Sequence, residues 1–286
     1  MAIRSGRGTT TGSCWPVIVA VLAITGTTSA AGYAQDLAQQ KKWCADSSNS
    51  DRAIGACTAI LQSGGESQYN MAVAFRFRGV AHHNRGEYDR AIQDFDEAIR
   101  LKPDYVAAFV SRGLAYYFRN QKDRAIQDFD QAIRLKPDDA DAFNHRGFVY
   151  DTMGQYDRAI EDFDQVVRLR PRDPWALNVR CYTKANAGRF DEALADCNES
   201  LKLMPSQAPA LEGRAYAYLK MGRLKESIAD FDESLRRRPQ SATTLFGRGV
   251  ARRRSGDVAA GDADIAAARK IDPSVDGFYA RRGVTP

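Results

Sequence analysis

Residue types that commonly carry catalysis or metal binding are scarce in this sequence. Its 286 residues include three histidines, three tryptophans and five cysteines. The cysteines form no CxxC pair, and the sequence contains no HExxH, GxSxG or P-loop motif. These absences argue against a thiol redox centre, a common zinc site, and the familiar hydrolase and nucleotide sites. We therefore expect no catalytic residue, no metal ion and no cofactor.

Strong charge of one sign is also missing. The formal net charge is only +5, and 44% of the residues are hydrophobic against 27% charged. A nucleic-acid binder usually has a larger basic excess gathered on one face. The composition predicts a soluble folded protein that does not bind nucleic acid.

No hydrophobic run is long enough to span a bilayer as a helix. The most apolar stretch covers residues 16–24, preceded by Arg4 and Arg7 and followed by small residues up to Ala34. A basic start, a short apolar centre and a small-residue end are typical of a signal peptide. We expect residues 1–34 to be removed, leaving an exported protein, periplasmic or extracellular, without an integral membrane span. The alternative is that the segment is retained as an anchor.

The dominant positive feature is a 34-residue period, which appears in three separate series of residues. Such a period indicates stacked repeat units. The prolines are Pro103, Pro137, Pro171, Pro205, Pro239 and Pro273; the arginines run from Arg78 to Arg282, and the aspartates from Asp94 to Asp264, at the same spacing.

Within one repeat, residues 106–139, the hydrophobic pattern predicts two amphipathic helices. Apolar residues recur at helical spacing on both sides of the polar stretch 119–122, and Pro137 follows the second helix. Proline there is expected because it cannot continue a helix. The small residues Gly113 and Ala125 are expected where the two helices cross most closely.

These motifs resemble those of the tetratricopeptide-repeat family. The family pattern of an aromatic, Gly and Tyr, then Ala, Phe and Pro, is matched in the third repeat by Phe143, Gly147, Tyr150, Ala159, Phe163 and Pro171. The resemblance implies an all-α, right-handed superhelical solenoid of stacked helix-turn-helix hairpins. It also implies a scaffold or adaptor that binds a protein or peptide, and not an enzyme.

The chain is expected to divide into four parts. These are a signal peptide at 1–34, a divergent helical hairpin at 35–71, six repeats at 72–275, and a C-terminal capping segment at 276–286. Residues Asp276 to Arg282 start a seventh hairpin that stops early. Atypical terminal units are expected because they close the stack.

Two features depart from the family pattern. Arginine replaces the usual leucine before the Gly position in every repeat, and an aspartate recurs on the second helix. We expect an internal Arg–Asp ladder along the solenoid; the alternative is a set of solvated pairs of small energetic value.

The four cysteines outside the signal segment fall two to a hairpin. Cys181 and Cys197 lie at similar heights on the two helices of one repeat, and Cys44 and Cys57 are placed in the same way in the N-terminal hairpin. In an exported protein this placement favours two disulfides. The alternative is four buried thiols that pack as small hydrophobic groups.

The resemblance implies that the first helices line a concave groove that binds the partner. Asn144 and Asn178, one repeat apart, could each hold one peptide unit of an extended chain. The other reading is an ordinary surface. The candidate partner-binding residues are Arg76, Tyr117, Asn144, Phe148, Asn178, Tyr182, Tyr216 and Phe246.

An alternative site lies at the arginine-rich C-terminal end. Arg252, Arg253 and Arg254 are consecutive there, and could bind an anionic envelope polymer or another anionic ligand. A solvated charged face is the simpler explanation of such a run.

Overall fold

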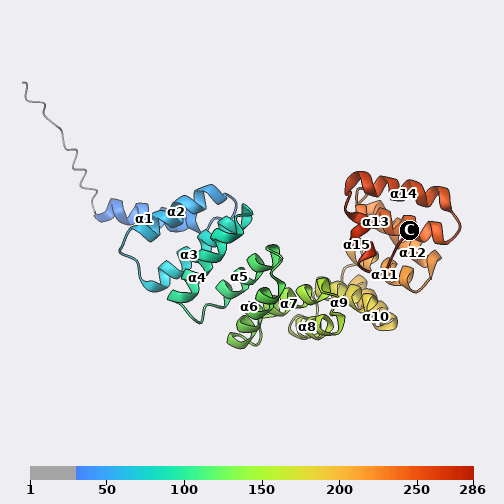
Figure 1. Cartoon of the computed structure of the whole chain (residues 1–286), viewed down its shortest axis with the longest axis horizontal. Coiled ribbons are helices and arrows are strands. Elements are labelled where there is room, and N and C mark those ends of the chain that lie inside the picture. Colours follow the sequence, from blue (N-terminus) through green and yellow to red (C-terminus); the bar gives the residue numbers. More distant parts are fainter. Residues whose placement is uncertain (1–29) are drawn as a thin grey trace, which may run out of the picture. The chain divides into compact units, whose positions relative to one another are not determined.

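The computed structural model describes the backbone of residues 30–286 and the side chains from Asp36 onward; the predicted signal segment lies almost wholly outside the described residues. Across residues 30–286 it contains helices and no strand (Figure 1). The helices are α1 Ala30–Cys44, α2 Ser50–Gln62, α3 Gln68–Asn84, α4 Tyr88–Leu101, α5 Val106–Phe118, α6 Lys122–Leu135, α7 Ala140–Thr152, α8 Tyr156–Leu169, α9 Pro174–Asn186, α10 Phe190–Leu203, α11 Ala208–Lys220, α12 Leu224–Arg237, α13 Ala242–Arg254, α14 Val258–Ile271 and α15 Val275–Ala280.

The chain divides into two units between Gln39 and Gln40, and the second of them, Gln40–Pro286, is compact. The second unit contains the repeats. Among the described helices, none combines the length and the apolar character needed to cross a membrane.

From α3 to α14 the helices form successive hairpins, and each helix packs on the next one in the chain (Figure 1). The sequence predicts this all-α solenoid, and the structure confirms it. The first hairpin starts slightly earlier than residue 72. Ser67 caps α3, because its hydroxyl accepts a hydrogen bond from the Asn70 backbone N–H at 3.2 Å.

The turn inside each hairpin from α3 to α14 contains a residue in the left-handed region. Gly86, Gly154, Gly188 and Gly222 have φ between 72° and 78° there, Gly256 has φ of 98°, and Asn120 takes the same place with φ of 58°. Glycine adopts this region without a Cβ penalty, and asparagine tolerates it better than most residues. The 34-residue spacing of these residues therefore fixes where every hairpin reverses.

The two helices of a hairpin approach most closely at the predicted small residue. A Cβ added to Gly113 would lie 2.8 Å from Phe129 Cε1, and one added to Gly79 would lie 2.6 Å from Phe95 Cε1. Both phenylalanines are fully buried. Glycine at this position therefore allows the aromatic ring to fill the helix crossing.

The Arg–Asp ladder is confirmed as an internal structure. Arg146 donates from Nε and Nη2 to the two carboxylate oxygens of Asp162, at 3.0 and 2.6 Å, and from Nη1 to Asp130 of the preceding repeat at 2.5 Å. Asp162 is 3% exposed. Arg146 thus clamps its own hairpin and ties it to the hairpin before, and the same bonds recur at Arg112, Arg180 and Arg248.

Both expected cysteine pairs are bonded in the structure. Cys44 joins Cys57 with Cα atoms 4.8 Å apart, and Cys181 joins Cys197 with Cα atoms 5.5 Å apart. All four side chains are buried.

Candidate functional site

The groove face is the side of the first helices that carries the candidate partner-binding residues. The structure divides this face into an open part, on α5 and α7, and a covered part, on α11 and α13.

In the open part, Tyr117 and Phe148 come together from neighbouring repeats. Their rings meet edge to face, with centroids 5.7 Å apart. Phe148 is 48% exposed, so its ring is open to contact with another molecule. The two rings line a hollow of about 460 Å³, called here the aromatic pocket, whose lining is Tyr117, Phe148, Asp151, Thr152, Met153, Gly154, Tyr156, Phe278, Arg281 and Arg282.

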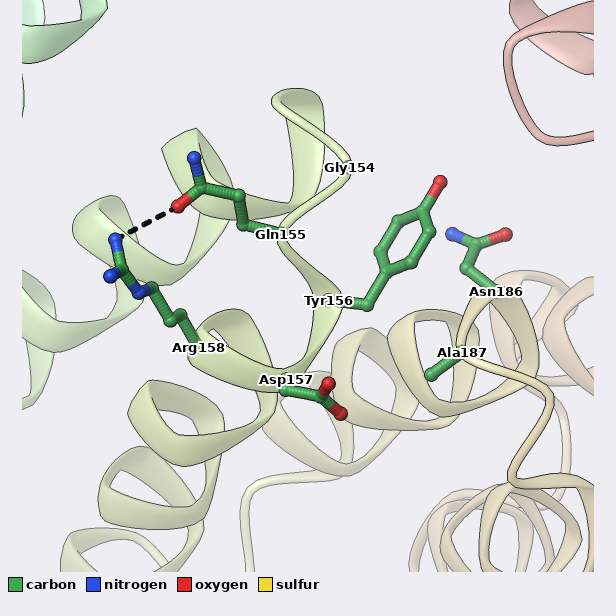
Figure 2. Close-up of a pocket in the computed structure, with 7 residues that line it drawn as sticks. All are labelled: Gly154, Gln155, Tyr156, Asp157, Arg158, Asn186 and Ala187. Atoms are coloured by element: carbon green, nitrogen blue, oxygen red, sulfur yellow. Dashed lines mark hydrogen bonds between the residues drawn. The ribbon is translucent and has the colours of Figure 1, made fainter.

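A second hollow, the turn pocket, adjoins the first and shares Gly154 and Tyr156 with it. Its volume is about 590 Å³. Figure 2 shows the Tyr156 ring pointing toward Asn186 across this space, while Gln155 and Arg158 lie on the other side, joined by a hydrogen bond of 3.1 Å. The lining is polar, so this hollow suits main-chain or amide groups better than an apolar anchor.

In the covered part, the C-terminal segment lies over the groove face. Phe246 is fully buried, and the Tyr279 ring stacks on it with centroids 4.9 Å apart. Tyr216 is also buried, and its hydroxyl donates to Asn186 Oδ1 at 2.8 Å. Two of the expected partner-binding residues, Tyr216 and Phe246, are therefore not free to contact another molecule while the segment stays in place.

Asn178 and Tyr182 lie between the two parts. Asn178 is only 4% exposed, and its Oδ1 is a buried acceptor without a hydrogen-bond partner in the described structure. It lies against Gly213 of the next repeat, where an added Cβ would be 2.6 Å from Oδ1. Because residue 213 is a glycine, the Asn178 amide has room to lie below the surface. The ring centroids of Tyr182 and Tyr216 are 5.5 Å apart. Burial raises the pKa of Tyr182 well above its usual range.

Comparisons with known proteins agree with the repeat architecture. Profiles described as TPR repeat match residues 79–118 and 113–154, and profiles described as tetratricopeptide repeat match residues 140–173 and 212–275. The chain belongs to the tetratricopeptide-repeat (TPR) family. It has no significant sequence match among curated proteins.

Solved TPR structures share the fold. A tetratricopeptide repeat protein from Parabacteroides merdae is 17% identical, with a TM-score of 0.71 over 87% of this chain and 98% of that chain. PilW, described as a type IV pilus biogenesis factor, is 20% identical, with a TM-score of 0.64 over 73% of this chain and 97% of its own. YrrB, described as a TPR protein with an unusual peptide-binding site, is 22% identical, with a TM-score of 0.54 over 66% and 96%. At these identities the likeness shows the fold alone.

The other two predicted groove residues of this TPR chain lie apart from the aromatic pocket. Arg76 is half-buried, donates from Nε to the Ala107 carbonyl oxygen at 3.4 Å, and lies over the Phe77 ring at 5.3 Å. Asn144 is half-buried on α7, one turn before Phe148. Of the two predicted groove asparagines, Asn144 is thus the accessible one, since Asn178 is buried.

The arginine-rich end of the TPR array is largely paired within the protein. Arg252 contacts Asp264 at 2.9 Å and Asp232 at 3.4 Å, and Arg253 contacts Asp262 at 3.0 Å. Arg254 donates to the Thr285 carbonyl oxygen at 3.0 Å. Since these cations already have partners, no observation favours an anionic ligand at this end.

Sequence reasoning missed several residues that shape the site. Asp151, Tyr156 and Phe278 line the aromatic pocket. Glu212, on the groove face of α11, is a second omission; burial raises its pKa, against the opposing hydrogen bonds of Thr243 and Thr244. A signal was present, because two adjacent aromatic residues, Phe278 and Tyr279, lie in the C-terminal segment. Within the described residues, no group of histidine, cysteine and carboxylate side chains could hold a metal ion.

Proposed function

We propose that this chain is an exported TPR scaffold or adaptor that binds a protein segment on its groove face, at the aromatic pocket. The observation that carries the proposal is the exposure of Phe148 inside a hollow that Tyr117 also lines. An exposed aromatic ring that lines a hollow together with a second aromatic ring and a few polar groups fits the lining that is typical of binding sites.

The chemistry of the pocket suits an apolar or aromatic anchor on a polypeptide. Tyr117 and Phe148 offer ring faces and edges, which are favoured in the central contacts of protein interfaces. Polar groups surround them, including Asp151 and the exposed Arg281. The adjoining turn pocket, with Gln155 and Asn186, offers amides that can both donate to and accept from a peptide backbone.

The proposal includes export. The basic and apolar pattern of residues 1–34 supports it, and so do the two disulfides, because such bonds persist in oxidising compartments. TPR proteins are generally scaffolds without catalysis, and we propose no enzymatic activity for this one. The peptide-binding site named for YrrB, which shares the fold, is in keeping with a peptide-binding role.

The test is capture of partners from the native envelope with wild-type protein and with Phe148→Ala as bait. Trp175→Ala is the matched control, because Trp175 is an exposed aromatic outside both pockets. A partner that binds the wild type and the control and is lost from Phe148→Ala supports the proposal. Equal capture by all three proteins would move the binding site elsewhere.

A further inference from the structure

The C-terminal segment, residues 275–286, departs from the position that its own repeat register predicts. Tyr279 and Arg282 follow Leu245 and Arg248 by 34 residues, so the period places them on the next first helix, stacked beyond α14. In the structure, Arg282 Nη2 lies 3.7 Å from Asp151 Oδ2 on α7. The segment therefore runs back along the groove face toward earlier repeats.

The reason for this departure is visible in the ladder. Every earlier ladder arginine from Arg112 onward donates to an aspartate or asparagine 16 residues before it, as Arg248 does to Asp232. The residue 16 before Arg282 is Ala266, which offers no acceptor side chain. The ladder thus ends at Arg248, and Arg282 is free to take another partner.

Tyr279 anchors the segment against α11 and α13. This residue is 2% exposed. Its ring stacks on Phe246, and its centroid lies 6.1 Å from that of the Tyr216 ring. Its hydroxyl donates to the Thr243 carbonyl oxygen at 2.9 Å. Val275 and Val284 are buried on either side of it. Covering of this kind is what buries the aromatic groove residues of α11 and α13.

Groove side chains also hold the main chain of the segment. Lys220 Nζ donates to the Arg282 carbonyl oxygen at 2.9 Å, and Arg254 Nη2 donates to the Thr285 carbonyl oxygen at 3.0 Å. The Arg282 guanidinium covers the Phe278 ring at 3.9 Å. An aromatic anchor in a pocket, together with cationic side chains on backbone carbonyls, is the way in which a groove grips a short peptide.

We propose that the groove face of α11 and α13 is a peptide-binding surface that residues 275–284 fill within the same chain. A partner that replaces the segment carries the same chemistry, namely a tyrosine followed at the third residue by an arginine, with small apolar residues on both sides. The inference rests on the proposed function of the groove face but concerns a different stretch of it. Release of the segment would also remove Phe278, Arg281 and Arg282 from the aromatic pocket and join the two stretches into one longer groove.

The probe is a fluorescent synthetic peptide of residues 273–286. The protein that should bind it is the full chain carrying Tyr279→Ala, in which the chain's own C-terminal segment has lost its anchor. Tyr69→Ala is the matched control, because Tyr69 is exposed on α3, away from this surface. By fluorescence anisotropy, the Tyr279→Ala chain should bind the peptide at least tenfold more tightly than the control, whose groove is filled. The same peptide with alanine in place of its tyrosine should not bind. Failure of a folded Tyr279→Ala chain to bind the peptide, or equal binding by both chains, would overturn the proposal.

A second measurement uses the unaltered chain and does not depend on how the variant folds. The amides of Arg282 and Val284, both bonded to the Tyr279 carbonyl oxygen, should exchange with solvent at least tenfold faster than the amides within α13 if the segment opens by itself. Exchange at the rate of α13 would show that the segment is an inseparable part of the core and would also overturn the proposal. Neither experiment uses the native partner, so a failure here is distinct from a failure of the proposed aromatic-pocket site.

Discussion

Cys181 and Cys197 occupy, in the fourth repeat, the two positions that Gly113 and Phe129 occupy in the second. In both repeats the residues are 16 apart, and in both they fill the closest crossing of the hairpin. A covalent bond thus stands where an aromatic ring packs on a glycine. The disulfide takes the place of a packing contact at the same helix crossing.

The first prediction concerns this replacement. The Cys181→Ala, Cys197→Ala double variant should lose about 3 kcal/mol of free energy of unfolding, because a loop of this length is no longer closed in the unfolded chain. Urea unfolding of the oxidised protein and of the variant measures the difference.

A matched variant tests the explanation. Cys181→Gly with Cys197→Phe restores the glycine–aromatic pair found in the second repeat, and it should be more stable than the double alanine variant. If the two double variants unfold at the same urea concentration, the packing equivalence is wrong.

The second prediction concerns the ladder. Arg146→Leu restores the residue usual in the family but leaves the buried Asp162 without its bidentate partner. Breaking a buried ion pair costs about 3–5 kcal/mol, and partial exposure of Arg146 reduces this to about 2–3 kcal/mol. Arg158→Ala is the control, since Arg158 is exposed and should change stability by less than about 0.5 kcal/mol.

The pH dependence of the same variant gives an independent check. Burial already raises the pKa of Asp162 in the wild type, against the opposing effect of Arg146. Removing Arg146 raises the pKa of Asp162 further. The folded variant then binds a proton more tightly than the unfolded chain, so its stability should increase as the pH is lowered from about 7 toward 5. A variant whose stability relative to wild type is unchanged over that range would contradict the buried-carboxylate explanation.

The third prediction concerns His145, which stacks on Phe129 with ring centroids 5.7 Å apart. Burial lowers the pKa of His145 below its ordinary value of 6.5, although Asp141 and Asp139 oppose the shift. The unfolded chain therefore takes up a proton first, and stability present above pH 6.5 is lost as the pH falls through the folded-state pKa. His145→Val, which copies the residue at the same position in the next repeat, should flatten the thermal stability profile between about pH 6.5 and 5. An unchanged profile would assign the pH dependence to other groups.

The repeat period predicted the interactions that recur with it. Gly113 was expected at the helix crossing, and there it faces Phe129; an internal Arg–Asp ladder was expected, and the structure shows its partners, as in Arg146 with Asp162. Phe148, which the family resemblance implies to be a groove residue, is exposed in the structure.

The period failed where the chain stops repeating. It assigns Tyr279 to a further stacked helix, but in the structure the Tyr279 ring stacks on Phe246 and covers the groove face of α13. Burial of Phe246 and Tyr216 follows from that long-range contact, which no local pattern encodes. Asn178 was misplaced for a related reason, because its burial depends on the absence of a side chain at Gly213.

The fourth prediction is export with cleavage. Mature protein isolated from the native source should begin at or near Gln35, because the small residues up to Ala34 suit a signal peptidase. Intact-mass measurement decides the point. Retention of Met1 or Cys14 in the mature protein would contradict it, and four alkylatable thiols in native protein would contradict the oxidised state.

The fifth prediction separates binding from folding with two pairs of substitutions, one pair on α7 and the other on α9 and α11. Phe148→Ala and Asn144→Ala should each weaken binding of the native partner, the amide by about 1–3 kcal/mol because its partner group is left unpaired, and the phenylalanine by at least as much if it is an anchor. Their melting temperatures should stay close to wild type, since Phe148 is largely exposed and Asn144 is half-buried.

Asn178→Ala and Tyr216→Ala should instead lower the melting temperature while the C-terminal segment is in place, because both side chains are buried. Phe129→Ala is the control for loss of stability, because the cavity that it leaves at the helix crossing should lower the free energy of unfolding by about 3–5 kcal/mol. Calorimetric titration with the captured partner and thermal unfolding of the five variants measure both properties together. Wild-type affinity in Phe148→Ala and Asn144→Ala would remove the aromatic pocket from consideration, and a large loss of stability in either would show that the open groove face is structural.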